Sequence, residues 1–456
     1  MKRRIPAQSV LYTLVLALGA PLNAFAVDGS RPNIVIIMAD DMGYGDLGCY
    51  GSTINKTPNI DRLAEAGLRF TDFHTSGPMC SATRAGMLTG RYQQRYGANF
   101  DGALSGESNV PGEGLPLDAV TFAEVLQAQG YATALFGKWH LGYAPPLTPP
   151  NQGFDEFRGF MTGDGDHHTH IDRSGNPDWW NGDQLEADEG YNADLLTDYS
   201  IDFVQRHKER PFLLFVSHLS IHFPWQGPND PPQRVAGTSY HDDKWGIIPD
   251  RSNIQPHVKA MVENLDANTG RLLDAIRAAG IAENTLIIFT SDNGGYITYG
   301  EDFKNISSNG PLRGQKTELW EGGHRVPAIF VWPGKIKPGV TDATGHSTDL
   351  FPTFARLAGA SVASMALDGL DINPLLFEGQ PLPDRQLFYR KDKAGAVRSG
   401  PWKLVHDGTT PQLFNLDNDI GETNDLAAEM PEKTAELMTA WRIWETDVNK
   451  SAAKYN

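Results

Sequence analysis

Four short apolar runs, each followed by polar residues, constrain the fold more than any other feature of the sequence. They are residues 33–38 (NIVIIM), 132–136 (ATALF), 212–216 (FLLFV) and 286–290 (LIIFT). Continuous apolar runs of this length are typical of strands buried on both faces of a sheet. Segments with helical character separate them, at 57–67, 122–129 and 258–279. This alternation predicts an α/β sandwich with a large, mainly parallel sheet.

Polar side chains follow each of these runs directly. Ligands of open α/β sheets bind at the carboxyl ends of the strands, so these side chains are expected to meet at one edge of the sheet. The residues concerned are Asp40, Asp41, Lys138, His140, His222, Asp292 and Asn293.

The pattern changes after about residue 375. Short alternating runs at 396–399, 402–405 and 412–416 predict antiparallel strands, and residues 431–446 predict a closing helix. We therefore expect a main domain at 27–374 and a small C-terminal α+β subdomain at 375–456.

The first 26 residues have the organisation of a signal peptide. Three basic residues at 2–4 precede an apolar run at 10–20 and an A-x-A site at 24–26. The apolar run is too short to span a bilayer, which disfavours the alternative of a membrane anchor. We expect an exported protein, periplasmic or secreted, without stable membrane insertion.

The net charge of the chain is −17, and it would be −20 without the three basic residues of the predicted signal peptide. An acidic chain of this kind is not expected to bind nucleic acid. An anionic ligand would require a locally basic cleft.

The chain has two cysteines, Cys49 and Cys80, which in an exported protein predict a disulfide by default. The surroundings of Cys80 favour another role. Residues 80–84 (CSATR) and 88–92 (LTGRY) resemble the signature of the type I sulfatases, with Ala82 where proline is commoner. The resemblance implies an alkaline-phosphatase-like sandwich, and a Cys80 that a dedicated maturation enzyme oxidises to formylglycine.

A hydrated aldehyde suits sulfate transfer because it carries two hydroxyl groups. One hydroxyl attacks sulfur, and loss of the proton from the other expels sulfate and restores the aldehyde. The difficult hydrolysis is thereby divided into two easier steps.

The resemblance also implies one divalent cation, held by Asp40, Asp41, modified Cys80, Asp292 and Asn293. Oxygen ligands suit calcium or magnesium and not zinc, and the family favours calcium. The catalytic set carried over from the family is Cys80, Arg84, Lys138, His140, His222, Asp292 and Lys316.

The resemblance implies distinct roles for these groups. Asp292 would activate the attacking hydroxyl, and His222 and Lys316 would flank the leaving oxygen. His140 would take the proton from the second hydroxyl, while Arg84 and Lys138 would hold the formylglycine. Fixed cations of this kind stabilise the charge that develops on sulfate oxygens.

Residues 161–190 match no family motif and have a polar, aromatic, loop-like composition. Loops over strand ends commonly set specificity. The candidates for binding sugar there are His167, His168, His170, Arg173 and Trp180. The alternative is a surface loop with a small tryptophan core of its own.

The resemblance predicts hydrolysis of sulfate esters on a sulfated oligo- or polysaccharide. An algal galactan such as carrageenan is expected ahead of a glycosaminoglycan. One alternative is a phosphatase or phosphodiesterase of the related fold, which would need two zinc ions. The other is a non-catalytic protein that binds sulfated glycans.

Overall fold

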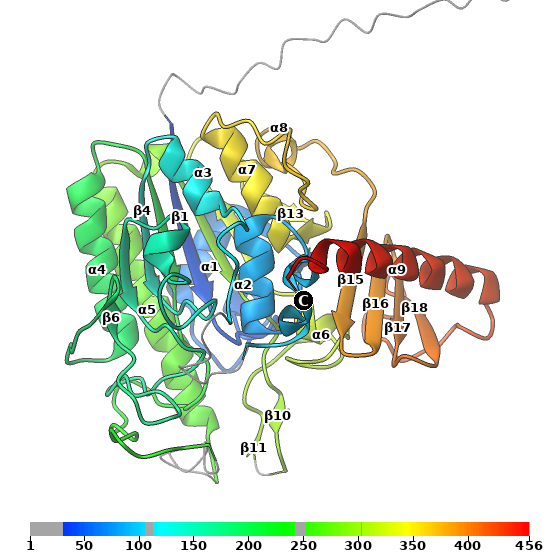
Figure 1. Cartoon of the computed structure of the whole chain (residues 1–456), viewed down its shortest axis with the longest axis horizontal. Helices are drawn as coiled ribbons and strands as arrows, with labels where there is room; N and C mark the ends of the chain where they lie inside the picture. The colour runs from blue at the N-terminus through cyan, green and yellow to red at the C-terminus, as the bar shows by residue number, and fades with distance from the viewer. Residues whose placement is uncertain (1–30, 105–112, 242–251, 302, 456) are drawn as a thin grey trace, which may run out of the picture.

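A computed structural model of the chain describes residues 31–104, 113–241, 252–301 and 303–455 (Figure 1). The predicted signal peptide, 1–26, lies outside these ranges. Within them, no helix combines the length and the apolar character needed to cross a membrane.

The main sheet has ten strands and confirms the predicted α/β class. Its order is β13-β2-β12-β9-β1-β8-β4-β5-β6-β7. Its centre is parallel and consists of β9 (Thr285–Ser291), β1 (Asn33–Ala39), β8 (Phe212–Ser217), β4 (Ala132–Gly137) and β5 (Glu156–Gly159).

Five short strands extend this centre, and the sequence patterns did not predict them. Antiparallel pairing brings in β12, β2, β6 and β7, while β13 pairs parallel to β2. Their bounds are β12 (Ala328–Val331), β2 (Leu68–Phe70), β13 (Gly339–Thr341), β6 (Trp180–Asn181) and β7 (Gln184–Leu185).

Helices cover both faces of the sheet, as the fully buried strands require (Figure 1). Along β1, Ile34 and Ile36 point into one hydrophobic core and Val35 and Ile37 into the other. The first core includes residues of α2 (Cys80–Thr89), α3 (Phe122–Ala128) and α7 (Leu350–Leu357). The second includes residues of α1 (Pro58–Ala66), α4 (Asn192–His207) and α5 (Gln255–Ala278).

The C-terminal part forms a four-stranded antiparallel sheet that projects from the main body (Figure 1). Its strands are β15 (Gln386–Lys391), β16 (Ala394–Ser399), β17 (Trp402–His406) and β18 (Pro411–Asn415). Helix α9 (Pro431–Ala452) packs Leu437, Trp441 and Trp444 against this sheet. The predicted antiparallel sheet is confirmed, although β15 was missed and α9 runs six residues past the predicted end.

Several shorter elements complete the fold. A hairpin, β10 (Thr298–Tyr299) and β11 (Phe303–Lys304), protrudes from the lower edge in Figure 1. The remaining short elements are β3 (Phe73–His74), β14 (Gly345–His346), α6 (Glu321–His324) and α8 (Asn373–Glu378).

Candidate active site

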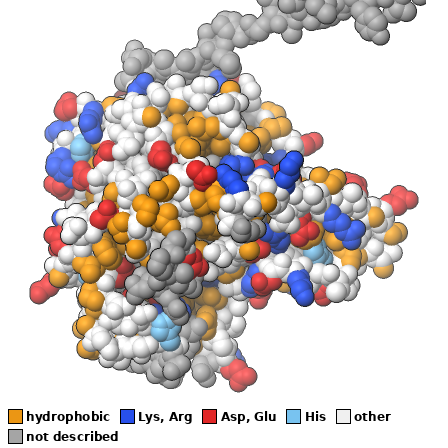
Figure 2. Space-filling view, in the orientation of Figure 1, with side chains coloured by type: hydrophobic (Ala, Val, Ile, Leu, Met, Phe, Trp, Pro, Cys, Tyr) orange, Lys and Arg blue, Asp and Glu red, His pale blue; other side chains and the backbone are white. Residues whose placement is uncertain are grey.

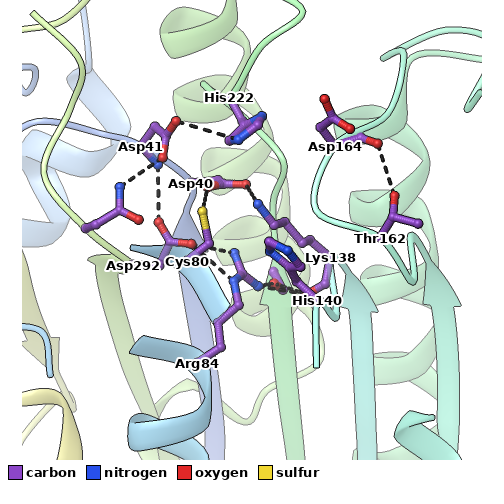
Figure 3. A network of polar contacts seen from close by, with 12 residues as sticks. Asp40, Asp41, Cys80, Arg84, Lys138, His140, Thr162, Asp164, His222 and Asp292 are labelled. Carbon is purple, nitrogen blue, oxygen red and sulfur yellow. Dashed lines mark hydrogen bonds and ion pairs between the residues drawn. The ribbon is translucent and has the colours of Figure 1, made fainter. Parts of the chain in front are cut away.

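The ends of the central strands bring the predicted residues together in one buried site (Figure 3). Asp40 and Asp41 follow β1, Lys138 follows β4, and Asp292 follows β9. Helix α2 begins at Cys80 and presents Arg84 one turn later, on the same face. The site therefore depends on segments that are far apart in the sequence.

Arg84 and Asp292 form a buried ion pair at the base of the site. The Nε and Nη2 groups of Arg84 donate to Oδ2 of Asp292 at 3.1 and 2.9 Å. The Nη1 group donates to the carbonyl oxygen of Lys138 at 2.7 Å and to the hydroxyl of Ser217 at 2.5 Å. These contacts fix the guanidinium, and sequence reasoning did not identify Ser217 as one of its partners.

Two lysines neutralise the carboxylates that follow β1. Lys138 Nζ donates to Asp40 Oδ2 at 2.6 Å, and Lys316 Nζ donates to Asp41 Oδ1 at 2.6 Å. The Sγ atom of Cys80 lies 3.1 Å from Lys316 Nζ and 3.5 Å from Asp40 Oδ1. Cys80, the predicted nucleophile, thus lies between groups of opposite charge.

The thiol of Cys80 is poorly suited to act as a nucleophile itself. Burial, reinforced by the Asp40 charge, raises the pKa of Cys80 to about 12. A thiol with such a pKa is protonated at neutral pH, and only the thiolate is strongly nucleophilic. Both cysteines are free, so the default disulfide does not form.

Four residues retain an oxygen suited to a cation. Asn293 Oδ1 is buried and has no hydrogen-bond partner in the described ranges. Asp40 Oδ1, Asp41 Oδ2 and Asp292 Oδ1 receive no donor from a described lysine or arginine, since these basic side chains use the other oxygen of each carboxylate. An all-oxygen set of this kind fits a hard divalent cation. The φ of 64° at Asp41 is unusual for a non-glycine residue and is typical of a constrained functional position.

The two histidines of the site are neutral. Burial and the nearby Lys138 charge hold the pKa of both His140 and His222 well below the ordinary value. His222 Nδ1 contacts the carbonyl oxygen of Phe223 at 2.8 Å, which leaves Nε2 facing Asp41 Oδ2 at 3.9 Å. His140 contacts the carbonyl oxygen of Leu104 through Nε2, and its Nδ1 has no partner in the described part of the chain. Each imidazole therefore has one nitrogen able to accept a proton.

Comparison with known proteins agrees with this geometry. The family described as Sulfatase matches residues 32–360, which is more than half of the chain. The chain belongs to the sulfatase family.

Named relatives and a solved structure extend the match over most of this sulfatase. Arylsulfatase A of Bos taurus is 37% identical, covering 94% of this chain and 89% of the relative. N-acetylgalactosamine-6-sulfatase of Canis lupus familiaris is 33% identical, covering 86% of this chain and 75% of the relative. The crystal structure of Ps i-CgsB in complex with k-i-k-neocarrahexaose is similar with a TM-score of 0.79 at 30% identity, covering 91% of this chain and 93% of that chain.

The predicted sugar-binding residues of this sulfatase occupy different environments. His167 is fully buried and contacts the carbonyl oxygen of His222 at 3.1 Å, while His170 stacks on Trp179 with ring centroids 4.1 Å apart. His168 contacts the carbonyl oxygen of Gly227, and Trp180 donates to Asp178 at the sheet edge. Arg173 lies over the ring of Phe223, which in turn contacts the ring of His222.

A second buried cluster of the sulfatase was not found by sequence reasoning. His74, Glu321 and His324 lie close enough to hold a metal ion. However, Lys403 Nζ already donates to Glu321 Oε1 at 2.8 Å and contacts His324 Nε2 at 2.7 Å. With His324 Nδ1 3.0 Å from His74 Nδ1, and His74 Nε2 3.0 Å from Asp72, the groups form a continuous hydrogen-bonded chain.

This histidine–lysine network joins the C-terminal sheet to the segment that leads to Cys80. Lys403 belongs to β17, whereas His74 lies six residues before Cys80. The amide of Thr75 also donates to the carbonyl oxygen of His324 at 2.8 Å. A lysine in contact with two of the three candidate ligands makes a structural role more favourable than metal binding.

Figure 2 shows acidic and basic side chains interspersed over the visible face of the molecule. The cations of the active site are instead buried, with Arg84 and Lys138 at 1% and 0% exposure. An acidic protein of net charge −17 therefore carries a local set of fixed positive charges where the strands end.

Proposed function

We propose that this sulfatase hydrolyses sulfate esters of a sulfated carbohydrate, with formylglycine made from Cys80 and one calcium ion. The observation that carries the proposal is the burial of Cys80 among three carboxylates and three basic side chains at the strand ends. The protonated thiol is consistent with a cysteine that must be modified before it can act.

The charge balance of the site supports an anionic substrate. The carboxylates of Asp40, Asp41 and Asp292 are matched one to one by Lys138, Lys316 and Arg84. One divalent cation on the remaining oxygens would leave the site with a positive charge of about two. That charge would be available to the sulfate group of the substrate and to its transition state.

Asp40, Asp41, Asp292 and Asn293 would hold the cation. When bound, calcium supplies charge stabilisation and orients the oxygen groups around it. The formylglycine hydrate would supply one hydroxyl for attack on sulfur, with release of the sugar alcohol, and a second hydroxyl whose deprotonation would break the C–O bond to the bound sulfate and restore the aldehyde.

The chain's own residues then have separable roles. Burial and the Asp40 charge raise the pKa of Asp292, which makes this carboxylate a better proton acceptor. The free Nδ1 of His140 is the proposed acceptor for the second hydroxyl proton. Although burial opposes its charge, Asp41 and Cys80 hold the pKa of Lys316 well above the ordinary value, so Lys316 acts as a fixed cation.

His222 and Lys316 are the proposed neighbours of the leaving oxygen. Both approach Asp41, His222 through Nε2 and Lys316 through Nζ, which places them on the same side of the site. Lys316 remains charged and stabilises the leaving oxygen as a cation. His222, which is neutral in this structure, would first take up a proton on Nε2 and then donate it to the leaving oxygen. Lys138 and Arg84 remain as the holders of the modified Cys80 and its charge.

A carbohydrate is the proposed substrate class because of the similar proteins. One similar structure is a complex with k-i-k-neocarrahexaose, and one relative is named for N-acetylgalactosamine-6-sulfate hydrolysis. A galactan such as carrageenan is preferred to a glycosaminoglycan. Of the five candidates, the partly exposed His168, Arg173 and Trp180 are the proposed sugar-side residues, because the side chains of His167 and His170 are buried. The signal-like residues 1–26 support export to the periplasm or the medium, where such polymers are found.

Hydrolysis of an aryl sulfate and an aryl phosphate, each with calcium or zinc after chelation, tests the proposal. We expect calcium-supported turnover of the sulfate that greatly exceeds turnover of the phosphate. Preference for the phosphate with zinc would favour the phosphatase alternative. Glycan binding without turnover, by protein produced with a maturation enzyme, would favour a binding protein.

A further inference from the structure

Arg173 lies beside the proposed leaving-group side of the site. Its Cζ atom lies 5.3 Å from the ring centroid of Phe223, and that ring lies 4.1 Å from the ring of His222. Figure 3 shows Asp164, the partner of Arg173, and His222 beyond the ends of the strands.

Arg173 is held in place by a shared carboxylate. Its Nε and Nη2 groups donate to Asp164 Oδ2 at 3.2 and 2.8 Å, and Arg234 Nη2 donates to the same oxygen at 3.1 Å. Two guanidinium groups on one carboxylate leave a net positive charge of one. The fixed orientation lowers the entropy lost when Arg173 binds a ligand.

Arg173 keeps part of its donor capacity. Its side chain is 25% exposed, and Nη1 makes no hydrogen bond to any residue in the described ranges. Arg234, in contrast, is fully buried and uses Nη1 on the carbonyl oxygen of Ile171. Of these two arginines, Arg173 is therefore the one able to meet a substrate.

A series of aromatic rings connects Arg173 to Lys316, another basic side chain of the site. Phe223 lies 6.0 Å from Tyr299, and Tyr299 lies 4.9 Å from Tyr296. Lys316 Nζ lies 5.3 Å from the centroid of Tyr296. Phe223 is buried, whereas Tyr296 and Tyr299 are partly exposed. Partly exposed rings between two cations suit a sugar that carries two negative groups.

We propose that Arg173 is a specificity-determining residue that binds a second anionic substituent of the substrate, a sulfate or a carboxylate. This inference rests on the proposed function, because it assumes that the first sulfate occupies the Cys80 site. A charge-assisted hydrogen bond from Nη1 is stronger for an anionic oxygen than for a hydroxyl group. Arg173 would thus select multiply charged sugars over singly sulfated ones.

The test compares wild type, Arg173→Gln and Arg158→Gln on three substrates. The substrates are 4-nitrophenyl sulfate and galactan oligosaccharides with one or two sulfates per repeat. Arg158 is a matched control, since its side chain is 27% exposed, pairs with Asp188 and lies 4.7 Å from the ring of Tyr199. Thermal melting of each variant checks that the fold is retained, and Arg173→Lys replaces Arg173→Gln if the latter unfolds.

We expect Arg173→Gln to lower kcat/KM for the doubly sulfated oligosaccharide about 10- to 100-fold. Its activity on the aryl sulfate should stay within about 2-fold of wild type, and Arg158→Gln should match wild type on all substrates. Arg173→Lys should partially reduce the preference for the doubly sulfated oligosaccharide, because lysine keeps the positive charge but lacks the paired N–H donors of the guanidinium group.

Equal losses of Arg173→Gln on all three substrates would overturn the inference and assign Arg173 a structural role. So would a wild type that turns over singly and doubly sulfated oligosaccharides equally well. Inactivity of the wild type on every sulfate ester would instead overturn the proposed function itself, and the inference with it.

Discussion

The buried pair of Arg84 and Asp292 allows a quantitative test of how the site is held together. Arg84 donates four hydrogen bonds, two of them to Asp292 Oδ2. Both side chains are at most 2% exposed. Replacing Arg84 with Met leaves a buried, unpaired carboxylate, which costs about 3–5 kcal/mol of unfolding free energy. Removing both charges, with Arg84→Met and Asp292→Asn together, should cost less than the sum of the single changes by about 2 kcal/mol.

These free energies of unfolding are measured by urea denaturation of the two single variants and the double variant in the presence of a chelator. Chelation is needed because a bound cation would compensate Asp292 in the absence of Arg84. Sulfate ester turnover should be lost in all three variants, including the double variant with recovered stability. Additive costs would refute the reasoning, because they would show that the two side chains do not interact as the distances indicate.

Three further predictions concern the cation, the histidine–lysine network and acid stability. Chelation should abolish turnover and lower the melting temperature, and full activity after chelation would contradict the proposed cation requirement. Asp292→Ala should reduce turnover more than Asn293→Ala, because it removes both a cation ligand and the proposed base. Lys403→Met should cost about 3 kcal/mol in urea denaturation, since it leaves a buried carboxylate without its closest cation, and a cost under about 1 kcal/mol would show that the network is dispensable. Two guanidinium groups outweigh burial and lower the pKa of Asp164 from 3.8. Its contribution to stability should therefore be constant above pH 4–5 and decline as the pH falls below the ordinary pKa, so the stability difference between wild type and Asp164→Asn should shrink on acidification.

The sequence predicted the central strands because their signals are local. A run such as residues 33–38 has no polar residue after Asn33, so neither face of the strand is expected to contact solvent. The polar residues that follow the run indicate the edge of the sheet where ligands bind. The same logic predicts that Asp40, Asp41 and Asp292 lie at this edge of the sheet. Helix α2 also begins at the motif cysteine, where the family signature starts.

Short edge strands and long-range networks escaped prediction for a different reason. Strands β6 and β7 have two residues each, which is too few to show an alternating pattern. The contact between His324 and Lys403 depends on how the C-terminal sheet docks, and no local pattern encodes that docking. The stacking of His170 on Trp179 also depends on the fold, and no local pattern predicts it.

The most direct test of the account is mass spectrometry of the peptide that contains Cys80, combined with sulfate release by the same preparation. The protein would be produced with and without a formylglycine-generating enzyme, with Cys80→Ser as the control. We predict that turnover rises in proportion to the fraction of position 80 found as the aldehyde, and that Cys80→Ser does not turn over although it folds. Full turnover by protein whose Cys80 remains an unmodified thiol would contradict the central claim.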